Sequence, residues 1–146
     1  MQDFVHDVPA SRVVFGAGRR KELVEELTRL SLGRALLVTD PALTAGRELA
    51  EELGPLLVGR FDGVVMHVPV EVARRAVKAA RSAGADCVVA VGGGSAIGIA
   101  KAVANETHLP VVAVPTTYAG SEMTPIWGIT ENHRKTTGRD PNVLPK

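Results

Sequence analysis

A run of three glycines and a serine, residues 92–95, is the part of this sequence best suited to chemistry. It follows the apolar run 86–91 and precedes a helix predicted from Ser95 to about Asn105. Glycines let the backbone approach a ligand closely, and the free N–H groups and dipole of a helix N-terminus attract anions. The serine can cap the helix or donate to a phosphate. The pattern therefore indicates a phosphate site, with a plain chain-reversing turn as the structural alternative.

Two further groups of polar residues follow predicted strands. Asp40 ends the apolar run 35–40, where its carboxylate can accept bonds from both ribose hydroxyls or cap the helix after Pro41. Residues 115–122 form a hydroxyl-rich loop after the run 111–114, and by itself this loop is typical of a plain surface loop. In a doubly wound sheet, ligands bind at the carboxyl ends of the strands. We therefore expect the three groups to converge.

The residue spacing disfavours several common sites. Ile97 stands where the G-x-G-x-x-G fingerprint needs its third glycine, and no Gly-Lys-Ser/Thr follows to make a P-loop. No metal site is predicted, because the four histidines lack ligand spacing. They are His6, His67, His108 and His133. No Ser/His/Asp or Cys/His arrangement carries a recognisable local signature either.

Predicted strands and helices alternate along the chain. The predicted strands are residues 12–16, 35–40, 64–68, 86–91 and 111–114. The first three predicted helices carry Leu23, Leu27 and Leu30, then Leu43, Leu49 and Leu53, then Val72, Ala76 and Ala80. Continuously apolar strands are typical of a parallel sheet covered on both faces. The prediction is an α/β fold with a doubly wound, mainly parallel Rossmann-like sheet and helices on both faces. After about Thr117 the pattern is lost, and the polar tail 132–146 is predicted to be a connection.

Composition limits the function classes. The 146 residues are 45% apolar and 23% charged, which is ordinary for a globular domain. Because 17 basic residues are interleaved with 16 acidic ones, no basic stripe favours a nucleic-acid partner. The single cysteine, Cys87, lies in an apolar run and is expected to be a buried, inert thiol. The chain shows no signal peptide and no apolar run of membrane-spanning length, so we expect a cytoplasmic protein without a membrane partner.

Several motifs together resemble a known superfamily. Residues 92–95 with Lys101, then residues 115–117 and 120–124, are similar to the iron-containing alcohol dehydrogenase and dehydroquinate synthase-like superfamily over nearly the whole chain. Within it, residues 115–131 and 135–140 resemble the maleylacetate reductases. Most iron-dependent alcohol dehydrogenases have aspartate three residues after the serine. This chain has Gly98, as maleylacetate reductases commonly do.

The resemblance implies NAD(P)H-dependent reduction of the carbon-carbon double bond of 2-maleylacetate to 3-oxoadipate, in bacterial degradation of aromatic and chloroaromatic compounds. It implies a nicotinamide dinucleotide (NADH favoured by Asp40, NADPH possible), a small dicarboxylate substrate and a homodimer. The implied cofactor-binding residues are Asp40, Gly92, Gly93, Gly94, Ser95, Thr116, Thr117, Tyr118, Ser121, Thr124, Ile126, Gly128 and Lys135. Asp40 would contact the adenosine ribose and the glycines the pyrophosphate. Lys135 would approach the nicotinamide ribose.

The superfamily also implies a second, all-helical domain that carries the metal ligands or the histidines replacing them. On this view residues 1–146 are one NAD(P)-binding domain, residues 132–146 begin the connection, and the catalytic residues are unknown because they lie in the missing domain. The chain itself would bind cofactor and no metal, without full activity. The alternatives are another iron-containing alcohol dehydrogenase-type reductase, a dehydroquinate synthase-like lyase using NAD transiently, and a non-catalytic nucleotide-binding module.

Overall fold

The computed structural model of the chain describes residues 10–146. Four strands form a parallel sheet in the order β2-β1-β3-β4. They are β1 (Ala35–Thr39), β2 (Leu57–Phe61), β3 (Cys87–Gly92) and β4 (Val111–Pro115). Every residue of β1 and β3 is buried, because both strands lie inside the sheet and both of its faces are covered. This explains why their sequences are continuously apolar.

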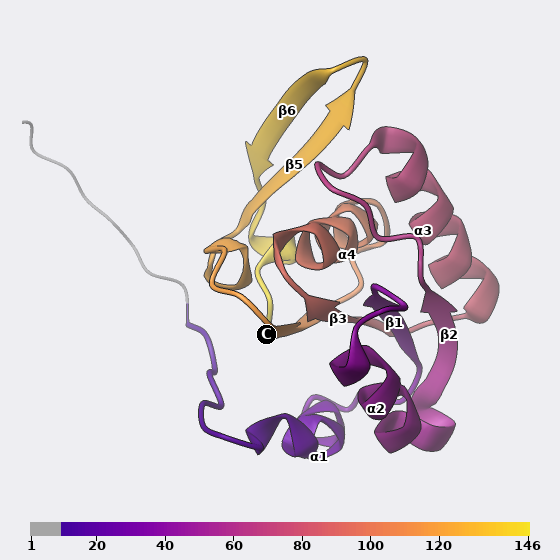
Figure 1. Cartoon of the computed structure of the whole chain (residues 1–146), viewed down its shortest axis with the longest axis vertical. Coiled ribbons are helices and arrows are strands. Elements are labelled where there is room, and N and C mark those ends of the chain that lie inside the picture. Colours follow the sequence, from indigo (N-terminus) through magenta and orange to yellow (C-terminus); the bar gives the residue numbers. More distant parts are fainter. Residues whose placement is uncertain (1–9) are drawn as a thin grey trace, which may run out of the picture.

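Helices cover the two faces of the sheet, as Figure 1 shows. They are α1 (Leu23–Arg29), α2 (Thr44–Leu53), α3 (Val70–Ala83) and α4 (Gly94–Thr107). Alternate strand residues face opposite sides: Leu36 and Val88 pack with α3 and α4, whereas Leu37 and Val89 pack with α1 and α2. Two apolar clusters therefore enclose the sheet, and the predicted doubly wound α/β class is confirmed.

The direction of winding places a crevice at one edge of the sheet. From β1 the chain goes through α2 to β2 on one side, and then returns through α3 to β3 on the other side of β1. The connections that leave the carboxyl ends of β1 and β3 therefore run in opposite directions, which makes this a topological switch point, where such sheets bind their ligands. Thr39 pairs with Val91 across this point, which brings Asp40 and the glycine turn after β3 to the same edge.

Two predicted strands are wrong. Residues 12–16 form no strand, and Val13 and Phe15 are exposed there. Residues 64–68 are a loop, because His67 and Val68 adopt positive φ angles of 66° and 46°, which no β-strand allows. The strand in this region is β2, whose polar Arg60 is tolerated because β2 is an edge strand with a single neighbour.

The region after Thr117 is more ordered than its sequence indicates. Strands β5 (Ile126–Glu131) and β6 (Arg134–Arg139) form an antiparallel hairpin that projects beyond the sheet in Figure 1. The tail then returns to the body: Val143 and Leu144 are buried, and the Lys146 amide donates to the Val111 carbonyl at 2.9 Å. The tail therefore packs on the body through two apolar side chains, which its mainly polar sequence did not indicate, and its role as the start of a connection stays a prediction.

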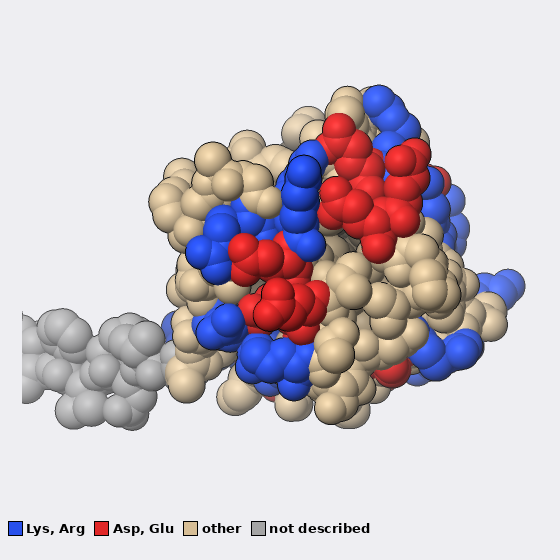
Figure 2. Space-filling model, turned by 90° about the horizontal axis from the view of Figure 1, so that it is seen from below, with Lys and Arg blue, Asp and Glu red and all other residues tan. Residues whose placement is uncertain are grey.

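Charges of both signs lie close together on the face that α1 and α2 form, which Figure 2 shows. Arg12 forms an ion pair with Glu26 at 2.8 Å, and Arg29 contacts the same carboxylate at 2.8 Å. Pairing of this kind leaves this face without a continuous basic stripe. Over residues 10–146, none of the helices has the length and apolar content needed to cross a membrane.

Candidate functional site

The glycine turn joins β3 to α4 at the switch point. Gly92 has a φ of 147°, which side chains rarely adopt, and its carbonyl accepts a 3.0 Å hydrogen bond from the Thr116 amide. A Cβ at Gly93 would lie 2.9 Å from Oγ1 of Thr117, and one at Gly94 would lie 3.2 Å from Cβ of Ala119. The glycines are thus required partly because the 116–119 loop lies directly against them.

Free backbone donors lie at the start of α4. The Ile97 amide donates to the Gly93 carbonyl at 3.2 Å, which is the first bond of the helix. The amides of Gly94, Ser95 and Ala96 precede it and so have no acceptor within the helix. Together with the helix dipole, these donors make the beginning of α4 an anion-attracting end.

A cleft of about 560 Å³ opens beside this helix end. Seven of the predicted cofactor residues line it: Gly94, Ser95, Ser121, Thr124, Ile126, Gly128 and Lys135. Two of them belong to α4, and the other five belong to residues 121–135, which comprise the loop before β5 and the β5–β6 hairpin. Residues that the sequence analysis did not assign to the site complete the lining: His67, Val68, Gly98, Ala119, Gly120, Trp127 and Thr137.

The other six predicted residues lie outside this lining. Gly92 and Gly93 form the turn itself, and Thr116 and Thr117 contact its backbone or its Cβ positions. Tyr118 is exposed. Asp40 is exposed at the end of β1, where its Oδ1 accepts a 2.8 Å bond from the Ala42 amide. Asp40 therefore closes a short turn before α2 rather than capping the helix, whose first residue is Thr44.

Gly98 and the 67–68 turn form one wall of the cleft. A Cβ at Gly98 would lie only 2.7 Å from Cγ2 of Val68, so the missing side chain gives Val68 room against α4. The Val68 carbonyl accepts a 3.0 Å bond from the Thr130 amide of β5, which fixes the turn from its other side. No pattern in the sequence placed His67 here, since its neighbours read as a strand.

Lys101 is a buried charged residue that lies close to the cleft but does not line it. It is fully buried in α4, and its Nζ donates to the carbonyls of Thr124 at 2.6 Å and Ile126 at 2.8 Å. Burial lowers the pKa of Lys101 to about 8, while the negative charge of Glu122 acts in the opposite direction. A lysine among the alanines and isoleucines of a buried helix was the available signal for this role.

The sequence profile of a known family covers this whole arrangement. The profile of the iron-containing alcohol dehydrogenases matches residues 10–146, which contain the sheet, the glycine turn and the hairpin. The chain belongs to the iron-containing alcohol dehydrogenase family.

Within this family the chain is similar to proteins named maleylacetate reductase. The protein of Rhizobium sp. (strain MTP-10005) is 52% identical over 147 residues, which span all of this chain and 42% of that protein. Its crystal structure aligns with a TM-score of 0.91. The protein of Pseudomonas knackmussii is 51% identical over 99% of this chain and 41% of its own length. The chain thus spans about two fifths of the length of these relatives.

A further solved structure of the family has the same fold. The putative alcohol dehydrogenase of Ralstonia eutropha JMP134 aligns with a TM-score of 0.93 at 54% identity, covering 99% of this chain and 41% of that protein. The predicted resemblance to the iron-containing alcohol dehydrogenases and their maleylacetate reductase branch is confirmed.

Cys87 and the histidines are of residue types that can be reactive or bind a metal ion. Cys87 is buried, and burial together with the neighbouring Asp86 raises its thiol pKa, so the expectation of an inert thiol agrees with its surroundings. Residues 10–146 contain no group of three or more His, Cys, Asp or Glu that could hold a metal ion. His6 lies outside the described residues.

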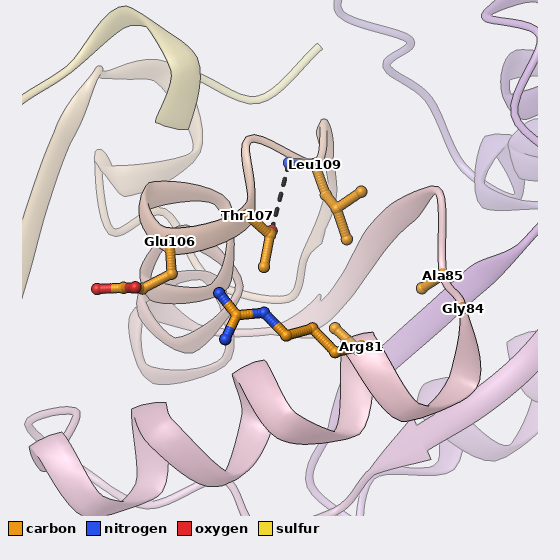
Figure 3. Close-up of a pocket in the computed structure, with 7 residues that line it drawn as sticks. Arg81, Gly84, Ala85, Glu106, Thr107 and Leu109 are labelled. Atoms are coloured by element: carbon orange, nitrogen blue, oxygen red, sulfur yellow. Dashed lines mark hydrogen bonds between the residues drawn. The ribbon is translucent and has the colours of Figure 1, made fainter.

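A second cleft, of about 400 Å³, lies at the opposite edge of the sheet, between the ends of α3 and α4 (Figure 3). Arg81, Glu106 and Leu109 line it, and the Leu109 amide donates to Oγ1 of Thr107 at 3.4 Å. It contains none of the residues predicted for the cofactor. It also lies beside the amino ends of β3 and β4, where doubly wound sheets do not place their ligands.

Proposed function

We propose that this chain is the NAD(P)H-binding part of a maleylacetate reductase. The whole protein would reduce the carbon-carbon double bond of 2-maleylacetate to 3-oxoadipate during bacterial breakdown of aromatic compounds. The observation that carries the proposal is the cleft at the start of α4, which brings together seven residues assigned to the cofactor from α4 and from the separate segment 121–135. Identity of 51–52% to two maleylacetate reductases supports the choice of substrate.

The residues around the cleft fit a dinucleotide. The glycine turn leaves a backbone surface without Cβ atoms, and the free amides at the start of α4 suit the charge of a pyrophosphate. Asp40, at the same edge, would accept hydrogen bonds from the hydroxyls of the adenosine ribose. Lys135 and Thr137, on the hairpin, would hold the nicotinamide half from the other side. When bound, the reduced nicotinamide supplies the hydride.

The protein's own contribution is to bind and orient. Ser121 and Thr124 line the cleft with hydroxyl groups, and Trp127 with Ile126 adds apolar side chains to its wall. A carboxylate at Asp40 favours NADH, because it would repel the 2′-phosphate of NADPH. We propose that residues 1–146 form one nucleotide-binding domain and that the proton donor lies in the part of the relatives' length that this chain does not span. A cytoplasmic location and a homodimer remain predictions.

The decisive experiment uses the natural full-length protein with NADH and 2-maleylacetate. We expect consumption of NADH that depends on 2-maleylacetate, with 3-oxoadipate as the product. NADH consumption with aldehydes or ketones instead would favour another reductase of the family. Turnover without net NADH consumption would favour a lyase that uses NAD transiently. NADH binding without any turnover would favour a binding module.

A variant of the glycine turn tests the cofactor site separately. Gly94→Val adds branched carbon atoms at a position where even a Cβ lies 3.2 Å from Ala119, so it should crowd the pyrophosphate position. We expect the Kd for NADH to rise at least about tenfold, equivalent to about 1.4 kcal/mol, with an unchanged circular dichroism spectrum. Gly33→Val, in a loop remote from the cleft, is the matched control. Equal affinity in the Gly94 variant and the wild type would contradict the assignment.

A further inference from the structure

Lys101 is a charged side chain placed where the fold needs an apolar one. It lies on α4 between the buried residues Ala100 and Ala102, and its side chain has no exposed surface. A buried ammonium is strongly unfavourable unless polar partners replace its water. A methionine or leucine would fill the same space without this cost. The presence of lysine therefore indicates that its hydrogen bonds serve a purpose.

Both partners of Lys101 belong to one short segment. The carbonyls of Thr124 and Ile126 accept from its Nζ at 2.6 and 2.8 Å, and the carbonyl between them, that of Pro125, accepts from the Asp140 amide at 2.9 Å. Three successive carbonyls are thus held in place. Thr124 and Ile126 also line the cleft, so these bonds fix the backbone of its wall.

The same helix holds the opposite wall. Gly94 begins α4 and lies seven residues before Lys101, a rise of about 10 Å along a rigid helix. We propose that Lys101 is a positioning residue, which fixes the 124–126 segment at a set distance from the glycine turn and so defines the width of the cofactor cleft. This inference rests on the proposed function, since it takes the occupant of the cleft to be the nicotinamide dinucleotide.

Glu122 favours a positive charge at residue 101. Its Oε2 is buried without a hydrogen-bond partner among the described residues, and its negative charge favours the ammonium form of Lys101. An ammonium has three donors, and the two carbonyls use two of them. Because Glu122 belongs to the 3₁₀ turn Ser121–Met123, its charge also favours a position of this turn near the Lys101 ammonium, although the two side chains form no ion pair.

The test compares Lys101→Met with wild type in the natural full-length protein. Methionine keeps the length and apolar character of the side chain and removes all its donors. Lys78→Met, the same change at an exposed site on the neighbouring α3, is the matched control. Kd for NADH by fluorescence titration, KM and kcat are measured, with circular dichroism and thermal unfolding to establish that each variant is folded.

We expect Lys101→Met to raise the Kd and KM for NADH at least about tenfold, to change kcat less, and to leave Lys78→Met equal to wild type. A folded Lys101→Met with wild-type affinity and only a lower Tm would overturn the proposal, because the lysine would then serve the fold alone. If Lys101→Met does not fold, Lys101→Arg, which keeps the donors on a longer side chain, is used and should fold with an intermediate Kd. Failure of both variants to fold also overturns it.

The two proposals fail in different ways. If the wild-type protein does not bind NADH at all, the proposed function is wrong and the positioning role falls with it. If wild type binds NADH and the Gly94 variant loses affinity while Lys101→Met does not, only the positioning role is wrong.

Discussion

Replacing Gly98 with alanine tests whether that glycine exists to let the 67–68 turn lie against α4. The added methyl group would lie 2.7 Å from Cγ2 of Val68, whereas carbon atoms in contact prefer about 3.5–4.0 Å. The turn must therefore shift by about 1 Å. It cannot move freely, because the Val68 carbonyl is bonded to the Thr130 amide at 3.0 Å.

Two opposing effects set the size of the change. Alanine is better than glycine inside a helix by about 1 kcal/mol, which stabilises the variant. Overpacking a buried contact costs about 1–3 kcal/mol, which destabilises it. The expected net result is a loss of about 0–2 kcal/mol in the free energy of unfolding. Because Gly98, Val68 and His67 all line the cleft, the shifted turn should also weaken NADH binding severalfold.

A double-mutant cycle with Val68→Ala isolates the contact. Val68→Ala removes the Cγ2 atom, so in the double variant the new methyl at residue 98 has space. We expect the two changes to be non-additive, with a coupling of about 1–2 kcal/mol in favour of the double variant. Urea unfolding followed by circular dichroism measures the stability, and fluorescence titration measures the NADH affinity. Additive changes, or a Gly98 variant more stable than wild type with full affinity, would refute the reasoning.

Two further predictions concern cofactor choice and acid stability. Asp40→Ser removes the exposed carboxylate at the end of β1. In the full-length protein it should lower the ratio of KM for NADPH to KM for NADH by about tenfold or more. An unchanged ratio would contradict the placement of Asp40 at the ribose. Hydrogen bonds from Arg12 and Arg29 lower the pKa of Glu26 to about 2 from 4.5, so its stabilising contribution is complete above pH 4.5 and is lost as the pH falls toward 2. Arg12→Ala should raise the Glu26 pKa and reduce the loss of stability over that window, which an NMR titration of the carboxyl and urea unfolding at several pH values would measure.

The sequence was most informative where local chemistry and burial point the same way. Strands β1, β3 and β4 are continuously apolar because they are covered on both faces, and the glycines after β3 have few explanations other than a close backbone approach. Both features can be recognised without knowing what packs against them. The alternation of strand and helix then leads to a doubly wound sheet with its ligand edge at the carboxyl ends.

The segments misread from the sequence are those whose conformation depends on distant partners. The apolar run at residues 64–68 resembles a strand, but close packing on Gly98 and a bond to Thr130 hold it in a turn with positive φ angles. The hairpin was missed because neither strand shows the alternation that marks a half-buried strand: the central residues of β5 are all partly buried, and β6 is almost entirely polar and exposed.

By itself, the sequence determined the fold class and the family, and it predicted a phosphate site at the glycine turn, since these follow from local pattern and from motifs that can be read along the chain. Only the tertiary structure decided which residues share the cleft and which carbonyls Lys101 holds. The physical reason is that hydrogen bonds and close contacts depend on distances across space. Residues 101 and 124 are remote in sequence. Only the packing of α4 against the segment 124–126 brings Nζ of Lys101 to 2.6 Å from the Thr124 carbonyl oxygen.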